Sequence, residues 1–292
     1  MKARHFMMSG RKTGVAAVAV LAGLAVVPAH APQGPAGTTP GNKPTVVLVH
    51  GAFADGGSWS GVVERLQHDG YQVIAPANPL RGMPQDATYL NSLLKSIKGP
   101  IVLVGHSYGG EVISQAAEGV DQVKALVYVN AIMPDKGESF SSLSAKFPPT
   151  KITGSFRQVP FRNGDGSAGT DVYIRSDKIR SVFAQDLPER QTRIMAVTQR
   201  PLALSAFTDK VGAVAWREKP VYVLVGKQDR AIDPRLERFE AKRADARRTW
   251  EIDSSHVSLV SHPQAVAGLI VTAADDYLRQ QANRSSTEPK IP

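Results

Sequence analysis

The chain has 292 residues, 42% of them hydrophobic, which is enough to bury a sizeable core, and we expect one large domain. Its formal net charge is +9, but four of the positive charges lie in the first dozen residues, and the other Lys and Arg residues are scattered among Asp and Glu. This distribution argues against nucleic-acid binding, and the absence of cysteine excludes disulfides, thiolate metal sites and a cysteine nucleophile.

The N-terminus has the pattern of a secretory signal peptide. A basic stretch at residues 2–12 precedes an apolar run at residues 15–27, and small residues follow. We expect cleavage after Ala29, since cleavage after Ala31 would place a proline at the first mature position. An uncleaved membrane anchor is the alternative, but the apolar run is shorter than the roughly 18 residues of a spanning helix. The sequence therefore predicts a signal peptide at 1–29 and a bacterial protein that is periplasmic or secreted, with no stable membrane anchor after cleavage.

The rest of the chain predicts a parallel sheet covered by helices. Residues 30–44 are rich in Pro, Gly and Thr and predict a flexible linker. Beyond it, short apolar runs alternate with longer amphipathic ones. Five predicted strands are almost wholly apolar, as in strands buried on both faces, and lie at 45–49, 72–75, 101–104, 125–129 and 221–225. Residues 248–252 alternate, which suits a strand nearer the sheet edge.

The predicted helices begin or end at prolines and glycines, and they lie at 59–68, 87–97, 110–117, 234–243 and 263–281. We therefore predict an α/β domain at 45–282, with a mostly parallel sheet of about six strands and helices on both faces. Residues 283–292 predict a disordered tail. Between 133 and 219 no strong strand is evident, but Phe, Leu, Ile and Val are frequent. We interpret this segment as a mainly helical cap inserted into the sheet domain.

A G-x-S-x-G motif carries the candidate nucleophile. Gly105-His106-Ser107-Tyr108-Gly109 directly follows a predicted buried strand and opens a helix. This context is the one that a nucleophile elbow requires, because the serine lies in a tight turn with strained backbone angles and only glycine leaves room beside it. The motif in this context therefore predicts an α/β-hydrolase fold with Ser107 as its nucleophile.

A serine nucleophile needs a base, and the base needs an acid that orients it. Asp229 and His256 follow the predicted strands at 221–225 and 248–252, so both belong to the edge where parallel strands end. Their order after Ser107 is the one expected in this fold. Asp253, three residues before the histidine, is the alternative acid.

Other candidates have structural interpretations. Asp233 precedes Pro234 and suits a helix N-cap. His262 precedes another proline and suits a capping or surface position, His106 suits packing beneath the elbow, and His50 suits a structural hydrogen bond.

The oxyanion hole of this fold uses the amide after the nucleophile, here that of Tyr108, and one from the loop after an earlier strand. We assign the second amide to Ala52. Phe53, Tyr108, Phe183 and Leu187 are candidates for the pocket lining, although Phe183 and Leu187 suit the core equally well.

Several motifs together resemble one branch of the α/β-hydrolases, which contains bacterial pyrethroid-type esterases, plant methyl-salicylate esterases and plant hydroxynitrile lyases. They are HGAFADGGSW at 50–59, GHSYGG at 105–110, QRPL at 199–202, KQDRAIDP at 227–234 and DSSH at 253–256. The resemblance runs from about Thr45 to Leu278. It implies Ser107 as nucleophile, Asp229 as acid, His256 as base, and Ala52 and Tyr108 as oxyanion donors, with no cofactor and no metal.

The resemblance also separates esterases from lyases. The lyases carry a lysine after the catalytic histidine and a threonine in place of the first glycine of His-Gly, whereas this chain has Val257 and Gly51. We therefore predict a serine esterase that acts on a small-molecule carboxylic ester. The alternatives are lactonase, perhydrolase or hydroxynitrile lyase chemistry on the same residues, and a non-catalytic binding protein of the same fold.

Overall fold

The computed structural model describes residues 43–287, and the predicted signal peptide, most of the predicted linker and the last residues of the tail lie outside this range. A six-stranded parallel sheet forms the centre, in the order β2-β1-β3-β4-β8-β9. Its strands are β1 (Thr45–Val49), β2 (Val73–Ile74), β3 (Ile101–His106), β4 (Val123–Val129), β8 (Val221–Gly226) and β9 (Arg248–Ile252).

The sheet is buried where its sequence is apolar. All residues of β1, β3 and β8 are buried, whereas β9 at the edge keeps exposed positions, as its alternating sequence predicts. The parallel register pairs Val49 with Gly105 and Gly105 with Tyr128, so the carboxyl ends of neighbouring strands lie at one edge. The loops that follow β1, β3, β8 and β9 therefore start close together.

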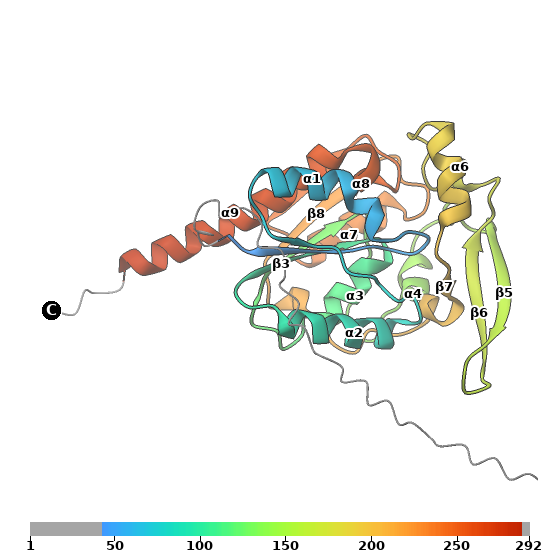
Figure 1. Ribbon diagram of the computed structural model, residues 1–292, viewed down its shortest axis with the longest axis horizontal. Helices are drawn as coiled ribbons and strands as arrows, with labels where there is room; N and C mark the ends of the chain where they lie inside the picture. The colour runs from blue at the N-terminus through green and yellow to red at the C-terminus, as the bar shows by residue number, and fades with distance from the viewer. Residues whose placement is uncertain (1–42, 288–292) are drawn as a thin grey trace, which may run out of the picture. The chain divides into compact units, whose positions relative to one another are not determined.

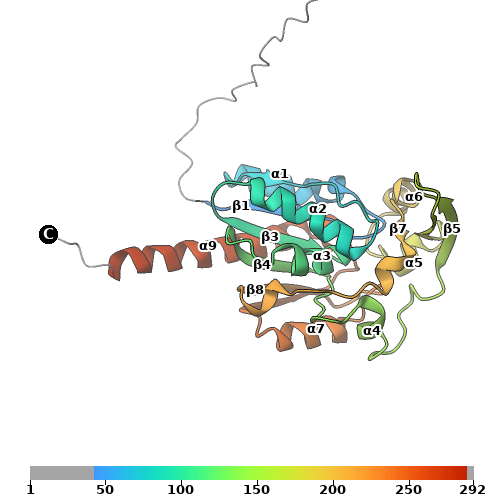
Figure 2. The ribbon, with the colours of Figure 1, turned by 90° about the horizontal axis from the view of Figure 1, so that it is seen from below.

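Helices cover both faces of the sheet (Figures 1 and 2). Helices α1 (Ser60–His68) and α9 (Pro263–Thr287) pack together on one face, whereas α2 (Met83–Ser96) and α3 (Tyr108–Ala116) pack together on the other. Helix α7 (Pro234–Arg243) packs on β8, and the short α8 (Ser258–Ser261) precedes α9.

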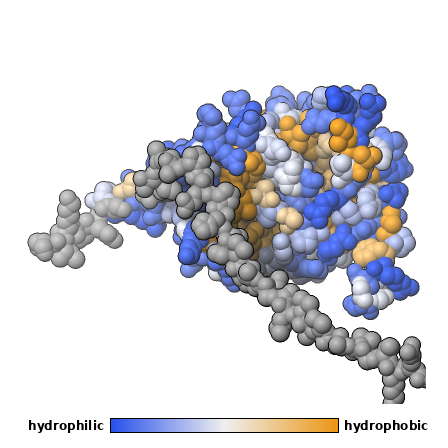
Figure 3. All heavy atoms as spheres, viewed as in Figure 1, coloured by the Kyte–Doolittle hydropathy of each residue, from blue (hydrophilic) through white to orange (hydrophobic). Residues whose placement is uncertain are grey.

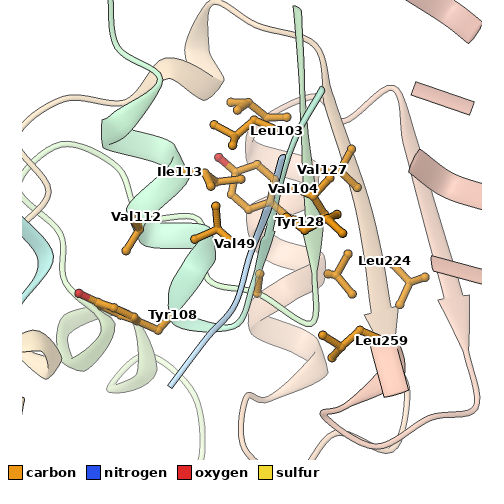
Figure 4. Packing of buried hydrophobic residues seen from close by; sticks show 14 of the residues in the cluster. Val49, Leu103, Val104, Tyr108, Val112, Ile113, Val127, Tyr128, Leu224 and Leu259 are labelled. Carbon is orange, nitrogen blue, oxygen red and sulfur yellow. The ribbon is translucent and has the colours of Figure 1, made fainter. Parts of the chain in front are cut away.

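Apolar side chains of the central strands meet α3 in the core. Figure 4 shows Ile113 of α3 near Leu103 of β3, and both side chains are fully buried. Burying a side chain of this size contributes roughly 1.5–3 kcal/mol, so this contact fixes α3 against the strand from which it starts.

The cap at 133–219 contains a small antiparallel sheet beside its helices, so the expectation that this segment has no strong strand was wrong, although more of its residues lie in helices than in strands. Its strands are β5 (Phe156–Arg162), β6 (Ala168–Ile174) and β7 (Leu202–Ala203). Short helices surround it: α4 (Phe140–Ser144), α5 (Ile179–Val182), α6 (Glu189–Thr198), and the 3₁₀ helices η2 (Leu204–Phe207) and η3 (Ala215–Arg217).

The apolar pattern of the sequence did not reveal this hairpin, because one of its faces meets solvent. Strand β5 is at the sheet edge and only partly buried, so it carries polar residues and even Pro160, which an edge strand tolerates. The Gly-rich patch forms the hairpin turn, in which the Asn163 amide donates to the Ser167 carbonyl at 2.9 Å. A strand of this kind lacks the apolar run that identifies a buried strand.

Helix α9 continues to Thr287, although residues 283–292 were predicted to be a disordered tail. The helix continues because no proline or glycine interrupts residues 269–287.

Within residues 43–287, no helix combines the length and apolarity that crossing a bilayer requires. The face drawn in Figure 3 is mostly hydrophilic, and the large hydrophobic side chains that are exposed include Ile194 and Val197 of α6.

Candidate active site

Ser107 lies in a strained turn between β3 and α3. Its backbone angles are φ 54° and ψ −126°, a combination that costs a non-glycine residue roughly 1–3 kcal/mol. Hydrogen bonds hold the turn: the Ser107 amide donates to the Asn130 carbonyl at 3.1 Å, and the Gly110 amide donates to the Ser107 carbonyl at 2.9 Å. The structure therefore has the elbow geometry that the motif predicts.

The glycines of the elbow are required by close packing of the backbone. A Cβ atom on Gly105 would lie 2.5 Å from the Gly109 carbonyl oxygen, and one on Gly109 would lie 2.5 Å from the Val49 carbonyl oxygen. A Cβ on Gly51 would lie 2.6 Å from the Ser107 Cβ. Strands β1 and β3 and helix α3 thus meet around Ser107 without room for a side chain on these glycines.

His256 and Asp229 form a buried pair in the loops after β9 and β8. The His256 Nδ1 lies 2.6 Å from the Asp229 Oδ2, and their side chains are 1% and 0% exposed. The other carboxylate oxygen, Oδ1, accepts from the amides of Ala231 at 2.7 Å and Ile232 at 3.0 Å. These donors stabilise the charged carboxylate, which in turn favours a proton on His256 Nδ1 and leaves Nε2 free to accept one.

His256 is held by one contact to its ring and one to its backbone. Phe183 of the cap lies against it, with ring centroids 4.9 Å apart. His106 Nε2 lies 2.9 Å from the His256 carbonyl oxygen, to which it donates. Burial and the neighbouring His256 lower the pKa of His106 well below its usual value, so it is a neutral structural residue.

Ser107 and His256 line the same cavity, which has a volume of about 50 Å³. Phe53 and Phe183 also line it, as the sequence predicts, whereas Leu187 does not and is buried in the core. Most of the lining is apolar and includes cap residues that sequence reasoning missed, namely Phe140, Phe156 and Phe207. No motif marks these residues, because only folding of the cap over the sheet brings them to Ser107.

The two proposed oxyanion donors, Ala52 and Tyr108, line this cavity as well. Tyr108 is the first residue of α3, so its amide has no acceptor within the helix. In the part of the chain that the structure describes, the Phe53 amide donates to the Arg200 carbonyl at 3.1 Å, whereas no protein group accepts from the Ala52 amide. The Ala52 and Tyr108 amides are therefore available to a ligand.

Asp253, Asp233 and His262 make contacts of their own outside the His256–Asp229 pair. Asp253 is exposed and pairs with Lys227, with Nζ and Oδ1 3.0 Å apart, so it is not the acid that orients His256. The Asp233 side chain caps α7 by accepting from the Arg235 amide at 2.8 Å. His262 is partly exposed and close to Ser261.

His50 is also structural. Its Nε2 accepts from the Asn78 amide at 2.9 Å, and its Nδ1 donates to the Gly51 carbonyl at 2.9 Å. Burial lowers its pKa to about 4, so the ring is neutral and fixes the loop that carries Ala52.

One acid of the cavity was not singled out from the sequence. Glu111 lines it and lies on α3 one turn after Ser107. Its spacing of four residues from the nucleophile is the signal that could have identified it, because such residues share one helix face.

Among residues 43–287, no group of three or more His, Asp or Glu side chains is arranged to hold a metal ion.

Comparisons with known proteins agree with this fold. A family model described as "Alpha/beta hydrolase family" matches residues 46–269. The chain is similar to a carbendazim hydrolyzing esterase of Nocardioides sp. (strain SG-4G), with 26% identity over 76% of this chain and 96% of the relative. It is also similar to Methylesterase 2 of Arabidopsis thaliana, with 24% identity over 80% of this chain and 97% of the relative.

A similar solved structure is that of a pyrethroid hydrolase from Sphingobium faniae JZ-2, with a TM-score of 0.64 and 21% identity over 80% of this chain and 98% of that one. The predicted fold and the predicted resemblance to pyrethroid-type esterases and plant methylesterases are confirmed. The chain belongs to the alpha/beta hydrolase family.

Proposed function

We propose that this protein is a serine hydrolase that cleaves carboxylic esters of small molecules through an acyl-enzyme. The observation that carries the proposal is the buried His256–Asp229 pair, whose imidazole lines the same apolar cavity as the strained Ser107. The alpha/beta hydrolase family and the names of the relatives, which are esterases and hydrolases, support ester hydrolysis.

In the proposed mechanism, His256 Nε2 takes the Ser107 hydroxyl proton as Oγ attacks the ester carbonyl carbon. Asp229 holds the ring and stabilises the imidazolium that forms. The Ala52 and Tyr108 amides bind the oxyanion, and His256 then gives its proton to the leaving alcohol. Water, activated by the same imidazole, releases the acid and regenerates Ser107. Two such donors contribute several kcal/mol of transition-state stabilisation.

The test is substitution of Ser107 combined with active-site labelling. We expect S107A to lose turnover of p-nitrophenyl acetate and labelling by a fluorophosphonate probe, while its circular dichroism is unchanged. S254A provides the matched control, because Ser254 is also a buried serine but does not line the cavity. Undiminished turnover or labelling in S107A would refute the assignment.

We also propose export. The basic and apolar segments of the N-terminus and the small residues near Ala29 support a cleaved signal peptide and a periplasmic or secreted bacterial protein. Mass spectrometry of the protein recovered outside the cytoplasm of a bacterial host should give a mature chain starting at His30. Full-length protein that stays in the cytoplasm would contradict this.

A further inference from the structure

Glu111 is an acid without a partner in the wall of the cavity. Its side chain is fully buried, and within residues 43–287 neither carboxyl oxygen has a hydrogen-bond partner. It lines the same cavity as Ser107, one helical turn further along α3. Nearby buried polar groups differ: Asp86 accepts from the Tyr108 hydroxyl at 2.8 Å, and the Ser114 hydroxyl donates to the Gly110 carbonyl at 2.8 Å.

The surroundings of Glu111 favour its neutral form. No lysine or arginine is among the described residues that line the cavity. Burial raises the pKa of Glu111 well above its usual value, and the acids Glu240 of α7 and Asp209 raise it further. A neutral carboxyl group offers one O–H donor and one carbonyl acceptor.

A buried polar group without a partner is costly, and native proteins contain few of them. Within residues 43–287 no protein group offsets this cost by a hydrogen bond to the Glu111 carboxyl, whereas a ligand in the cavity would supply the missing partner. The rise of an α-helix is about 5.4 Å per turn, so the partner would lie a few bonds from the carbonyl carbon that Ser107 attacks.

We propose that Glu111 determines substrate specificity by donating a hydrogen bond to a neutral oxygen acceptor, such as a ketone or ether oxygen, a few bonds from the scissile ester carbonyl. The inference rests on the proposed ester hydrolysis and adds the substrate class: small esters with a second, uncharged oxygen function. An anionic group in this position would have no cation to pair with, since no lysine or arginine is among the described residues that line the cavity.

The proposed hydrogen bond is tested with pairs of esters that carry either a ketone oxygen or a methyl group at the same carbon. The two groups are similar in size, but only the oxygen accepts a hydrogen bond. Methyl 4-oxopentanoate is compared with methyl 4-methylpentanoate for the acyl side, and 4-oxopentyl acetate with 4-methylpentyl acetate for the alcohol side. We expect wild-type kcat/KM to favour the oxo ester by about tenfold in at least one pair. E111Q, which keeps an N–H donor, should retain this preference, and E111M should lose or reverse it.

The ratio within each variant cancels differences in the folded fraction. Glu118 is an exposed acid just beyond α3, and E118M should leave every ratio unchanged. Calorimetric binding of the same pairs to S107A measures the preference without turnover. Equal oxo/methyl ratios in wild type and E111M, in both kinetics and binding, would overturn the role of Glu111 and leave ester hydrolysis standing. Absence of hydrolysis and binding for all four esters would instead remove the proposed function and this inference with it.

Discussion

His106 donates a hydrogen bond from Nε2 to the main-chain oxygen of His256, and this bond links the elbow of Ser107 to the loop that carries the imidazole. The two rings lie close together, with centroids 4.9 Å apart. The end of strand β3 is thereby tied both to Ser107, which follows it directly, and to the backbone of His256. His106, to which the proposed mechanism gives no chemical step, thus connects the two residues of the proposed reaction.

Replacement of His106 should therefore impair activity more than stability alone explains. We expect H106L to lower kcat/KM for p-nitrophenyl acetate by about 10–100-fold, because the His256 loop loses its donor. The free energy of unfolding should fall by about 1–3 kcal/mol, from the unpaired carbonyl. Kinetics on the folded fraction and urea titration measure the two effects. H68L, at an exposed histidine, should change neither.

The acid of the pair is tested by two substitutions in neighbouring loops. D229N should lower kcat by about 10³–10⁴-fold, because an amide neither stabilises the imidazolium nor favours the reactive tautomer. D253N should retain activity, since Asp253 contacts Lys227 at the surface. Steady-state kinetics with a p-nitrophenyl ester distinguish the two, and a larger loss in D253N would reverse the assignment.

Buried acids should make the protein less stable as the pH rises. Burial raises the pKa of Glu240 from 4.5 to about 8. The Met133 amide, Arg243 and Lys146 lower this pKa, whereas the negative charge of Glu138 adds to the increase. The folded protein keeps this proton between these values while the unfolded chain releases it. The contribution of protonated Glu240 to the free energy of unfolding is therefore fully present below about pH 4.5 and is lost as the pH rises to about 8.

Replacement by glutamine should remove this loss, since E240Q cannot ionise and still accepts from the Met133 amide. Urea unfolding at pH 5 and pH 8 should give a decrease in wild type that is smaller in E240Q, by roughly 2–4 kcal/mol. Equal decreases in both proteins would show that Glu240 is charged when folded.

Two aromatic residues should limit the length of the substrate. Phe156 and Phe207 line both the cavity at Ser107 and a larger neighbouring groove, with ring centroids 5.6 Å apart. We expect wild type to prefer p-nitrophenyl acetate and butanoate over octanoate. F207A should open the cavity into the groove and raise the octanoate/acetate ratio of kcat/KM by about tenfold. F239A, at an exposed phenylalanine of α7, is the control.

The sequence by itself determined the central sheet and the elbow. Strands buried on both faces are continuous apolar runs, so β1, β3, β4 and β8 were predicted close to their bounds. The elbow was equally readable, because Gly105 and Gly109 flank Ser107 for a local steric reason. Asp229 and His256 followed from the rule that loops after parallel strands share one edge.

Only the tertiary structure decided how the cavity is lined and what the cap is. Strand β5 meets solvent on one face and pairs only with β6, so nothing in its local sequence distinguishes it from a loop. Phe156 and Phe207 reach Ser107 because the cap folds over the sheet, a contact between residues distant in sequence. The same holds for Glu111: its spacing from Ser107 is local, but its lack of a partner depends on every element packed around it.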